Sequence, residues 1–257
     1  MSVRSTFIAS LFIILMCQTC TYGNEVNTIE MKLKYKGELG SKGSTNGQFM
    51  FPHSLAVDNS GNIYVGDTGN QRIQKFSQNG TFLTSWGSAG SNDNQFQGLH
   101  DVTLDPEGKF VYTVELKNHR VQKFCPNGTF ISKWGFNGTG GRDSLRAPHQ
   151  IAVNSNGLVY LTDRDGNQLL KFYPNGTFLE TIGSKGTRPG QFDGPHGIAF
   201  DTDNNIYITD MHNSRVQVFN SNDTFIREWG SFGNGTRQFS ETAPGIAVDK
   251  SDHVYLV

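Results

Sequence analysis

One short segment recurs five times along this chain, and its regular spacing constrains the fold more than any other feature. The segment PHSLAV at residues 52–57 returns as LHDVTL (99–104), PHQIAV (148–153), PHGIAF (195–200) and APGIAV (243–248). The steps between equivalent residues are 47, 49, 47 and 48 residues long. Repeats of this length are typical of stacked supersecondary units that bury their apolar faces only against one another.

Each unit has the pattern of four short strands. In the first unit these strands are expected at 55–57, 63–65, 72–76 and 81–86, where β-branched and aromatic residues gather. A polar turn containing Gly61 separates the first two strands, and the pair Asn79-Gly80 predicts a tight hairpin between the last two. No stretch after the first 23 residues shows helical periodicity. The repeats therefore predict an all-β chain, a β-propeller of four-stranded antiparallel blades.

The repeat boundaries define four complete blades and parts of others. The complete blades cover about 46–92, 93–141, 142–189 and 190–236; residues 237–257 begin a further blade, and 34–40 align with a fourth strand. Two arrangements fit this order. We expect a fragment of a longer ring, with six blades; the alternative is a closed ring of five blades in which the last blade lacks a strand.

The first 23 residues have the pattern of a secretory signal. Arg4 precedes an apolar run from Phe7 to Met16, and small residues lead to an expected cleavage after Gly23. The apolar run is short for a membrane span, although an uncleaved anchor is the alternative. The sequence thus predicts a secreted, extracellular propeller over residues 24–257 with no membrane span after cleavage.

Cysteine content and charge narrow the classes of function. Cys17 and Cys20 lie in the signal, so Cys125 is alone after cleavage and no intrachain disulfide is expected. The formal net charge is −1, from 22 basic and 23 acidic residues. No basic stretch is interleaved with aromatic residues, which argues against nucleic-acid binding.

The sequence contains six Asn-x-Thr sites, and four of them fall at the same hairpin of successive blades. Asn-Gly favours the turn and Thr favours the strand after it, which explains the pattern without glycans. With a secretory signal, these asparagines are also predicted N-glycan acceptors. The hairpins between third and fourth strands lie on one face of the ring, so glycans there would leave the opposite face open for partners. We call that opposite face, made of blade-to-blade crossovers and second-to-third loops, the crossover face. The six sites are Asn79, Asn127, Asn137, Asn175, Asn222 and Asn234.

A histidine stands at the start of the first strand in each of four blades. These are His53, His100, His149 and His196, and they are expected to ring the central channel on the crossover face. Neutral imidazoles around one axis are suitable ligands for a metal such as zinc. The alternative is a structural role, in which each ring hydrogen-bonds crossover backbone.

Acidic residues end the second strands, and asparagines recur shortly after them. We expect these side chains to hydrogen-bond loop backbone rather than to take part in chemistry. They are Asp67, Glu115, Asp163 and Asp210, with Asn70, Asn118, Asn167 and Asn213.

The fourth repeat carries the resemblance to a known family. The segment GQF…PHGIAFDTDNNIYITDMHNSRVQVF at 190–219 resembles the consensus of the NHL repeat. The resemblance extends over residues 34–257 and implies a six-bladed propeller. It implies little about function, because one fold carries many different sites.

A second, more local resemblance concerns the secreted propellers of the peptidyl-α-hydroxyglycine α-amidating lyase family. Pro-His segments at 52–55 and 148–151, the pair Asp163-Arg164 and the segment 129–135 are similar to segments of that family. The resemblance implies zinc held by channel histidines of alternate blades. Arg164 would pair with a substrate carboxylate in the cleavage of a C-terminal hydroxyglycine to an amide and glyoxylate.

Two departures weaken the lyase resemblance. The third alternate-blade ligand should fall near Pro244, where Ala243-Pro244-Gly245 has no histidine. The family's catalytic tyrosine should follow Thr113, and the loop 114–118 has none. The sequence therefore favours a module that binds an extracellular protein, peptide or glycan on its crossover face. The alternative is a zinc-dependent peptidylamidoglycolate lyase or an inactive relative of one. Neither the ligand nor the oligomeric state follows from the sequence.

Overall fold

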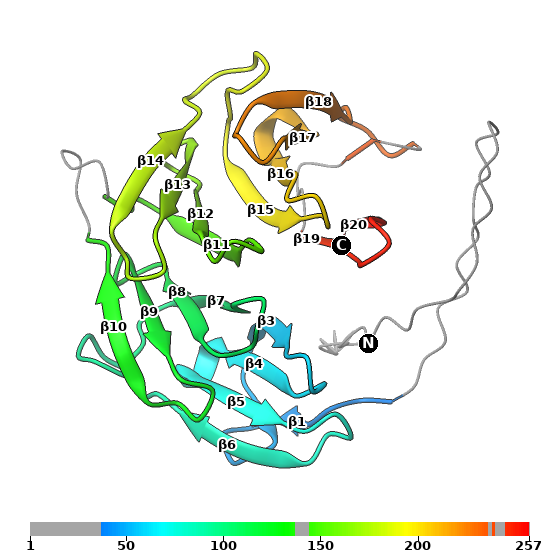
Figure 1. The fold of residues 1–257 in the computed structure, drawn as a ribbon. Coiled ribbons are helices and arrows are strands. Elements are labelled where there is room, and N and C mark those ends of the chain that lie inside the picture. Colours follow the sequence, from blue (N-terminus) through cyan, green and yellow to red (C-terminus); the bar gives the residue numbers. More distant parts are fainter. Residues whose placement is uncertain (1–36, 137–143, 236–237, 240–244, 257) are drawn as a thin grey trace, which may run out of the picture.

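The computed structural model describes residues 37–136, 144–235, 238–239 and 245–256. Its strands form four-stranded sheets that follow one another around an axis, as the sequence predicts (Figure 1). The described chain is a β-propeller. The first two blades contain β3 (Pro52–Val57), β4 (Ile63–Asp67), β5 (Arg72–Phe76), β6 (Phe82–Trp86), β7 (Leu99–Leu104), β8 (Val111–Glu115), β9 (Arg120–Phe124) and β10 (Phe130–Trp134). The next two contain β11 (Pro148–Val153), β12 (Val159–Asp163), β13 (Gln168–Phe172), β14 (Phe178–Ile182), β15 (Pro195–Phe200), β16 (Ile206–Asp210), β17 (Arg215–Phe219) and β18 (Phe225–Trp229).

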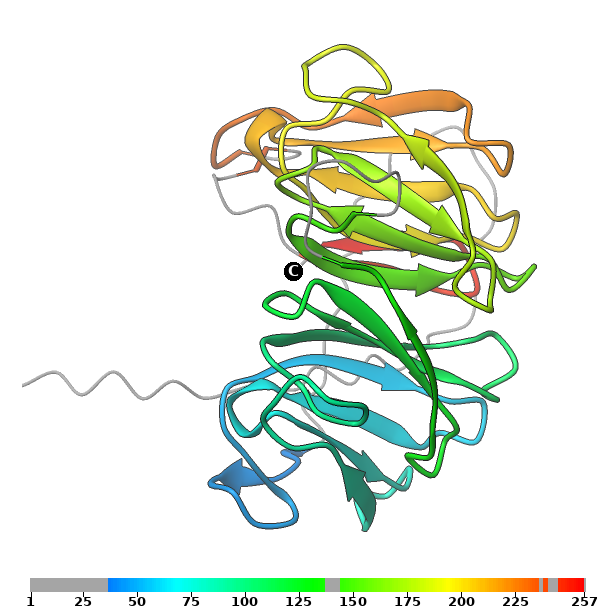
Figure 2. The same ribbon diagram turned by 90° about the vertical axis from the view of Figure 1, so that its left-hand side faces the viewer.

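Every complete blade is a meander in which each strand pairs with its sequence neighbours. The order is β3-β4-β5-β6 in the first blade and the same in the other three, with all pairs antiparallel. The first strand of each blade lies nearest the axis (Figure 1). Figure 2 shows the blades from the side, with the strands running between the two faces of the ring.

Shorter elements lie at both ends of the described chain. β1 (Ser41–Lys42) pairs in parallel with β2 (Gln48–Phe49), and β19 (Ile246–Val248) pairs with β20 (Val254–Leu256). The helical elements of the described ranges are single turns, η1 (Thr68–Asn70) and η2 (Met211–Asn213). No helix in these ranges has the length and apolar character needed to cross a membrane. The expected secretory signal lies outside the described residues.

The strand expected at residues 34–40 differs from the structure. Residues 37–40 carry no strand, because no described strand lies beside them to complete a ladder. Leu39 nevertheless takes a blade position: a Cβ added to Gly80 would lie 3.3 Å from its Cδ1. Trp86 covers Gly128 in the same way in the next blade, so residues 37–40 follow the path of an outer strand.

The core lies between neighbouring sheets. One cluster joins Tyr112 and Val114 of β8 to Ile151 and Leu161 of the following blade. The first strand of a blade is buried by the blade before it. The first blade has no described blade before it, so residues of β3 are more exposed than their equivalents. Leu55 of β3 is 44% exposed, whereas its equivalents Val102, Ile151 and Ile198 are 2–3% exposed.

The Asn-Gly pairs form the predicted hairpins. In the first, the Gly80 amide donates to the Ser77 carbonyl at 2.9 Å, and Gly80 has a left-handed φ of 83°. The register of β5 and β6 shifts beside this turn, as expected for a hairpin with a glycine bulge. The fourth blade uses Asp223 instead, with φ 62°.

Candidate functional site

The four channel histidines lie against one another in chain order. Ring centroids are 4.1 Å apart for His53 and His100, 3.8 Å for His100 and His149, and 3.8 Å for His149 and His196. The ring planes are tilted by 49–60° between neighbours. The four histidines, which the sequence places around the central channel, thus form a continuous stack that links four blades.

The first two histidines each link their own blade to the next one through a contact between Nδ1 and a backbone carbonyl. His53 Nδ1 lies 2.9 Å from the carbonyl oxygen of His100, and His100 Nδ1 lies 2.8 Å from the carbonyl oxygen of His149. The structural alternative predicted bonds to crossover backbone; the partner is instead the first strand of the next blade. These bonds hold the ring of each histidine toward the following one.

Within the described ranges the third and fourth histidines show no such bond, and the carbonyl equivalent for His196, that of Pro244, lies outside those ranges. Nδ1 of His149 and Nδ1 of His196 are buried, and neither has a hydrogen-bond partner among the described residues. The carbonyl of His196 already accepts from the Thr162 hydroxyl at 2.7 Å. A buried polar nitrogen without a partner costs free energy, so these two atoms are candidate contacts for a ligand.

Burial keeps the stack neutral. Desolvation, followed by the positive charge of its neighbours, lowers the pKa of His149 from 6.5 to about 2. The pKa values of His100 and His196 fall to about 4, again mainly through desolvation. The positive charge of Arg164 also contributes to lowering all three pKa values.

The described ranges hold no ready-made group of metal ligands. No three histidine, cysteine, aspartate or glutamate side chains in the described ranges are placed to hold an ion. Nδ1 of His53 and Nδ1 of His100 already face backbone carbonyls, so only their Nε2 atoms are free to ligate. The zinc prediction would need the rings to move apart from the observed stack.

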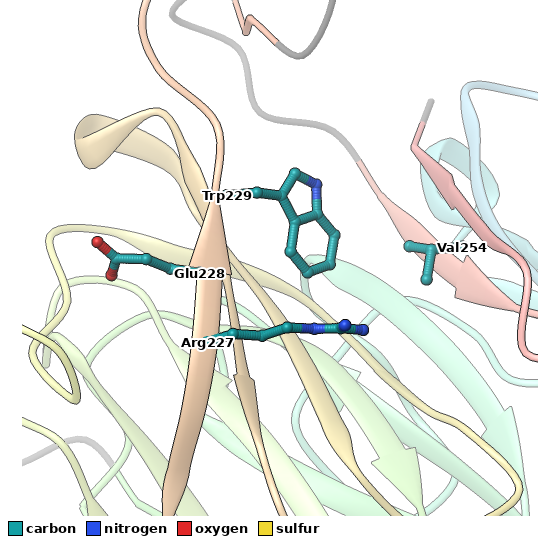
Figure 3. A pocket seen from close by; sticks show the side chains of 4 residues that line it. All are labelled: Arg227, Glu228, Trp229 and Val254. Atoms are coloured by element: carbon teal, nitrogen blue, oxygen red, sulfur yellow. The ribbon is translucent and has the colours of Figure 1, made fainter. Parts of the chain in front are cut away.

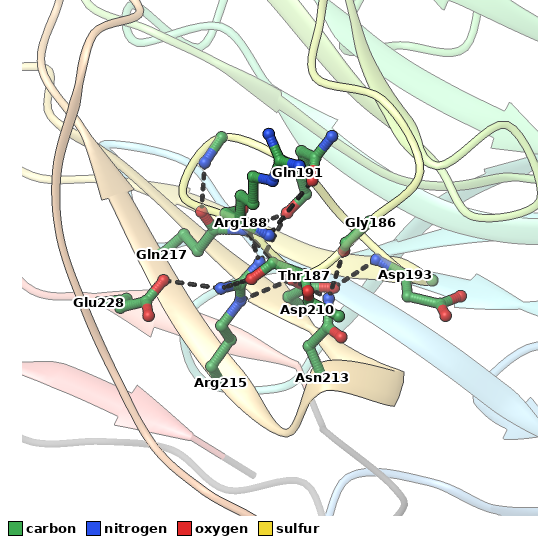
Figure 4. A network of polar contacts seen from close by, with 12 residues as sticks. Gly186, Thr187, Arg188, Gln191, Asp193, Asp210, Asn213, Arg215, Gln217 and Glu228 are labelled. Atoms are coloured by element: carbon green, nitrogen blue, oxygen red, sulfur yellow. Dashed lines mark hydrogen bonds and ion pairs between the residues drawn. The ribbon is translucent and has the colours of Figure 1, made fainter.

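A repeated clamp holds the crossovers in three of the four blades. In the fourth blade, Asp210 accepts from Arg215 at 2.9 Å and from Asn213 at 2.8 Å, and the Asp193 amide donates to it at 2.7 Å (Figure 4). Arg215 also donates to the carbonyls of Thr187, Arg188 and Gln191. The loop acids thus have the predicted structural role. Equivalent pairs are Asp67–Arg72 at 2.9 Å and Glu115–Arg120 at 2.7 Å.

The third blade departs from this clamp. Asp163 is completely buried, yet the position of the clamp arginine holds Gln168, whose Nε2 lies 3.4 Å from the carboxylate. The predicted Asn167 is one residue out of register and donates to the Asp165 carbonyl at 3.3 Å. Arg164 follows Asp163 and pairs with the exposed Asp165 at 3.0 Å. The irregular blade is the one that carries the most buried histidine of the stack.

The residue after each channel histidine was missed by sequence reasoning. Asp101 is 7% exposed, accepts from the Ile151 amide of the next blade at 3.0 Å and from the Val102 amide at 2.9 Å. Desolvation raises its pKa from 3.8 to about 7. Gln150 makes the same connection to the Ile198 amide at 2.8 Å. Comparing this position across the repeats would have revealed a polar link between blades.

The predicted N-glycan acceptors lie on both faces. Asn79, Asn127, Asn175 and Asn222 are exposed at the hairpins, on the face opposite the crossovers. Asn234 is exposed within the crossover that follows β18. Asn137 lies outside the described residues.

A pocket of about 350 Å³ lies at the open end of the arc, between β18 and β20 (Figure 3). Its lining consists of Arg227, Glu228, Trp229 and Val254. Trp86 and Trp134 each cover the hairpin glycine of the following blade, Gly128 and Gly176. Trp229 has no such glycine among the described residues, so this pocket is a feature of blade packing.

The family model of the NHL repeat matches three segments of the chain. The matched residues are 49–76, 145–172 and 192–219, each running from the end of a crossover to the third strand of a blade. This chain contains NHL repeats and folds as a β-propeller.

Curated proteins related to this NHL propeller match short parts of it. Human NHL repeat-containing protein 3 is 32% identical over 78 residues, which cover 30% of this chain and 21% of that protein. The Drosophila melanogaster protein brain tumor is 39% identical over 64 residues, covering 25% of this chain and 6% of that protein. The NHL propeller thus spans a small part of the length of these relatives.

Solved structures share the fold at low identity. Virginiamycin B lyase from Staphylococcus aureus aligns with a TM-score of 0.59 and 17% identity, over 80% of this chain and 62% of that chain. A gluconolactonase from Xanthomonas campestris aligns with a TM-score of 0.58 and 15% identity, over 82% and 71%. These likenesses concern the propeller fold alone.

Proposed function

We propose that this NHL propeller is a secreted, N-glycosylated binding module, and that its crossover face contacts an extracellular protein, peptide or glycan. NHL propellers commonly serve as protein-interaction modules. Glycans on the four hairpin sequons would cover the side opposite the crossovers, and among the described acceptors Asn234 lies on the crossover face itself.

One observation on that face carries the proposal. Phe51 is 76% exposed and adopts a left-handed φ of 49°. Its equivalents Gly98 and Gly194 are glycines with φ of 69° and 72°. A phenylalanine in this conformation costs about 1–2 kcal/mol, and here the ring gains no burial in return. Phe51 lies, like Leu55, on the side of the first blade beside which no blade is described, and contact with a partner on the crossover face would bury its ring.

The loop between the second and third strands of the first blade leaves room for phenylalanine where other blades have glycine. At Gly98, an added Cβ would lie 3.0 Å from Lys117 of the same blade, and Gly194 is equally close to His212. In the first blade the loop position is Gly69, so the large residue lies in the crossover and the small one in the loop. The local packing thus permits Phe51 but does not require it.

Affinity capture from extracellular fluid, together with a glycan array, tests this function. A saturable ligand should be retained by the propeller and lost in Phe51→Ser, while Leu83→Ser, a matched exposed apolar residue on the outer strand β6, retains it. The absence of a saturable ligand from both experiments would contradict the proposal.

A second candidate is the lyase-like activity, supported by the unpartnered Nδ1 atoms of His149 and His196 beside the charge of Arg164. Zinc, when bound, would supply Lewis-acid polarisation of a substrate oxygen. Because the stack does not match a ligand set, no reaction step is assigned to it. Metal analysis of the purified protein and an assay for glyoxylate from a peptidyl-hydroxyglycine test this candidate. Zinc below about 0.1 per chain with no glyoxylate released would end it.

A further inference from the structure

The two faces of the propeller carry opposite charge. The face opposite the crossovers holds the first-to-second strand turns, in which acidic residues predominate. They are Asp58, Asp105, Glu107, Asp201, Asp203, Asp249 and Asp252, against Lys109 and Lys250. On the crossover face the described loops carry more basic than acidic residues.

Two acidic residues of the crossover face are paired with cations within the structure, and a third contacts a histidine. Asp93 pairs with Lys133 at 2.6 Å, Asp165 pairs with Arg164 at 3.0 Å, and Asp193 lies 3.2 Å from His212. His212 is charged only when protonated, so Asp193 keeps its negative charge in neutral solution, as does Glu38 at the edge of the first blade. Part of the negative charge of this face is therefore paired internally.

The basic residues of the same face are not used in this way. Arg146, Lys185 and Arg188 are exposed, and none of the three makes an ion pair within the described ranges. Arg146 directly precedes β11, while Lys185 and Arg188 lie on the crossover that leads to β15. The three unpaired charges therefore lie on the crossovers that lead into the third and fourth blades, which are neighbours in the fold.

We propose that the binding partner is an acidic peptide segment, which docks over the crossovers of the third and fourth blades through Arg146, Lys185 and Arg188. This inference rests on the proposed function and specifies the chemistry of its partner. A face with unpaired cations attracts anionic segments and steers their approach.

Apolar residues on the same face favour a peptide over a sulfated glycan. Phe136 is 45% exposed and begins the crossover before β11; Phe232 is 66% exposed and lies in the crossover after β18. These rings flank the basic crossovers on either side. Apolar side chains of a peptide can cover these rings and remove them from water, whereas a sulfated glycan offers mainly charge.

The test measures peptide binding to the full secreted chain by fluorescence anisotropy. The probe is a labelled 14-residue peptide that alternates Glu and Phe; matched peptides replace Glu by Gln or by Lys, and a heparin fragment represents sulfated glycans. The acidic peptide should bind at least about tenfold more tightly than the others, and raising NaCl from 50 to 300 mM should weaken it several-fold.

Two matched double variants locate the contact. Arg146→Glu/Arg188→Glu should weaken the acidic peptide at least about tenfold, whereas Lys109→Glu/Lys250→Glu, on the opposite face, should stay within about twofold. Both pairs are exposed, and both change the net charge equally.

Three results would overturn the inference: equal binding of the Gln or Lys peptide, equal losses in both double variants, or binding of heparin alone. The proposed function has its own outcome. A saturable ligand from the capture experiment whose affinity changes neither with salt nor in Arg146→Glu/Arg188→Glu would support the binding module and contradict the acidic partner. No ligand in either experiment would remove both.

Discussion

The imidazole of His100 lies between two neighbours: its Nδ1 is 2.8 Å from the carbonyl oxygen of His149, and its ring centroid is 3.8 Å from that of His149. The same geometry joins His53 to His100. Three blades are thus linked near the axis by side chains that must be neutral to lie so close together.

This stack predicts that stability falls in mild acid. The folded pKa values of His100, His149 and His196 lie below the ordinary 6.5, so the unfolded chain binds more protons once the pH drops below about 6.5. Stability is therefore complete above pH 6.5 and is lost toward pH 4, by up to about 1.4 kcal/mol per pH unit for each group. Urea unfolding at several pH values measures this slope.

Asp101 works in the opposite direction. Its folded pKa is raised to about 7, so it contributes stability in acid that is lost as the pH rises from about 4 to 7. Asp101→Asn should therefore steepen the acid loss, and His149→Gln should flatten it. A free energy of unfolding that stays constant between pH 6.5 and 4.5 in the unmodified chain would contradict both expectations.

The crossover clamp predicts a large cost for one substitution. Arg120→Gln removes the partner of the fully buried Glu115 and three bonds to crossover carbonyls. We expect a loss of about 3–5 kcal/mol in the free energy of unfolding, because a buried charge is left unpaired. Arg164→Gln is the control: its pair with Asp165 is exposed and should be worth less than about 1 kcal/mol. Similar losses in the two variants would contradict the clamp.

The hairpins predict different costs for two glycines. Gly128→Ala introduces a Cβ 2.8 Å from Trp86 at a φ of 89°, so backbone strain and a clash combine. Gly190→Ala has a φ of 79° with nothing within 4 Å, so only the strain of about 1 kcal/mol applies. Thermal unfolding should show that Gly128→Ala is less stable than Gly190→Ala by about 1–3 kcal/mol. Equal losses of stability in the two variants would show that the Trp86 side chain moves away from the new Cβ without cost.

The sequons predict N-glycans on the hairpins of protein made in a eukaryotic secretory host. The side-chain oxygens of Asn127 and Asn175 accept from the amides of Thr129 and Thr177 at 3.1 and 3.0 Å, which leaves the exposed amide nitrogens free. Thr129→Ala and Thr177→Ala keep these backbone bonds and remove the sequons. Each substitution should lower the intact mass of the protein by one glycan without weakening the binding of the captured ligand. An unchanged mass would show that the site is not used.

Much of this architecture was predictable, because the repeat fixes it locally. Alternating apolar residues specify strands, and Asn79-Gly80 specifies a hairpin through glycine's left-handed backbone. The equivalent start positions of four blades also indicated that the four histidines share the channel. The strand expected over residues 34–40 depended on a neighbour rather than on its own residues, and the structure assigns no strand to 37–40.

Only the tertiary structure decided the chemistry of the site. The same histidine is bonded through Nδ1 in two blades and has no described Nδ1 partner in two others, and the carbonyl that follows His149 in this pattern accepts instead from Thr162. The role of Asp101 depends on the Ile151 amide of the next blade. The roles proposed for Phe51 and Arg146 depend on the lack of a described neighbour that buries the ring or pairs with the charge. The sequence determines which repeats form, since strand and turn propensities act over neighbouring residues. Burial and charge pairing act across blades, and they depend on which surfaces the packed repeats bring together.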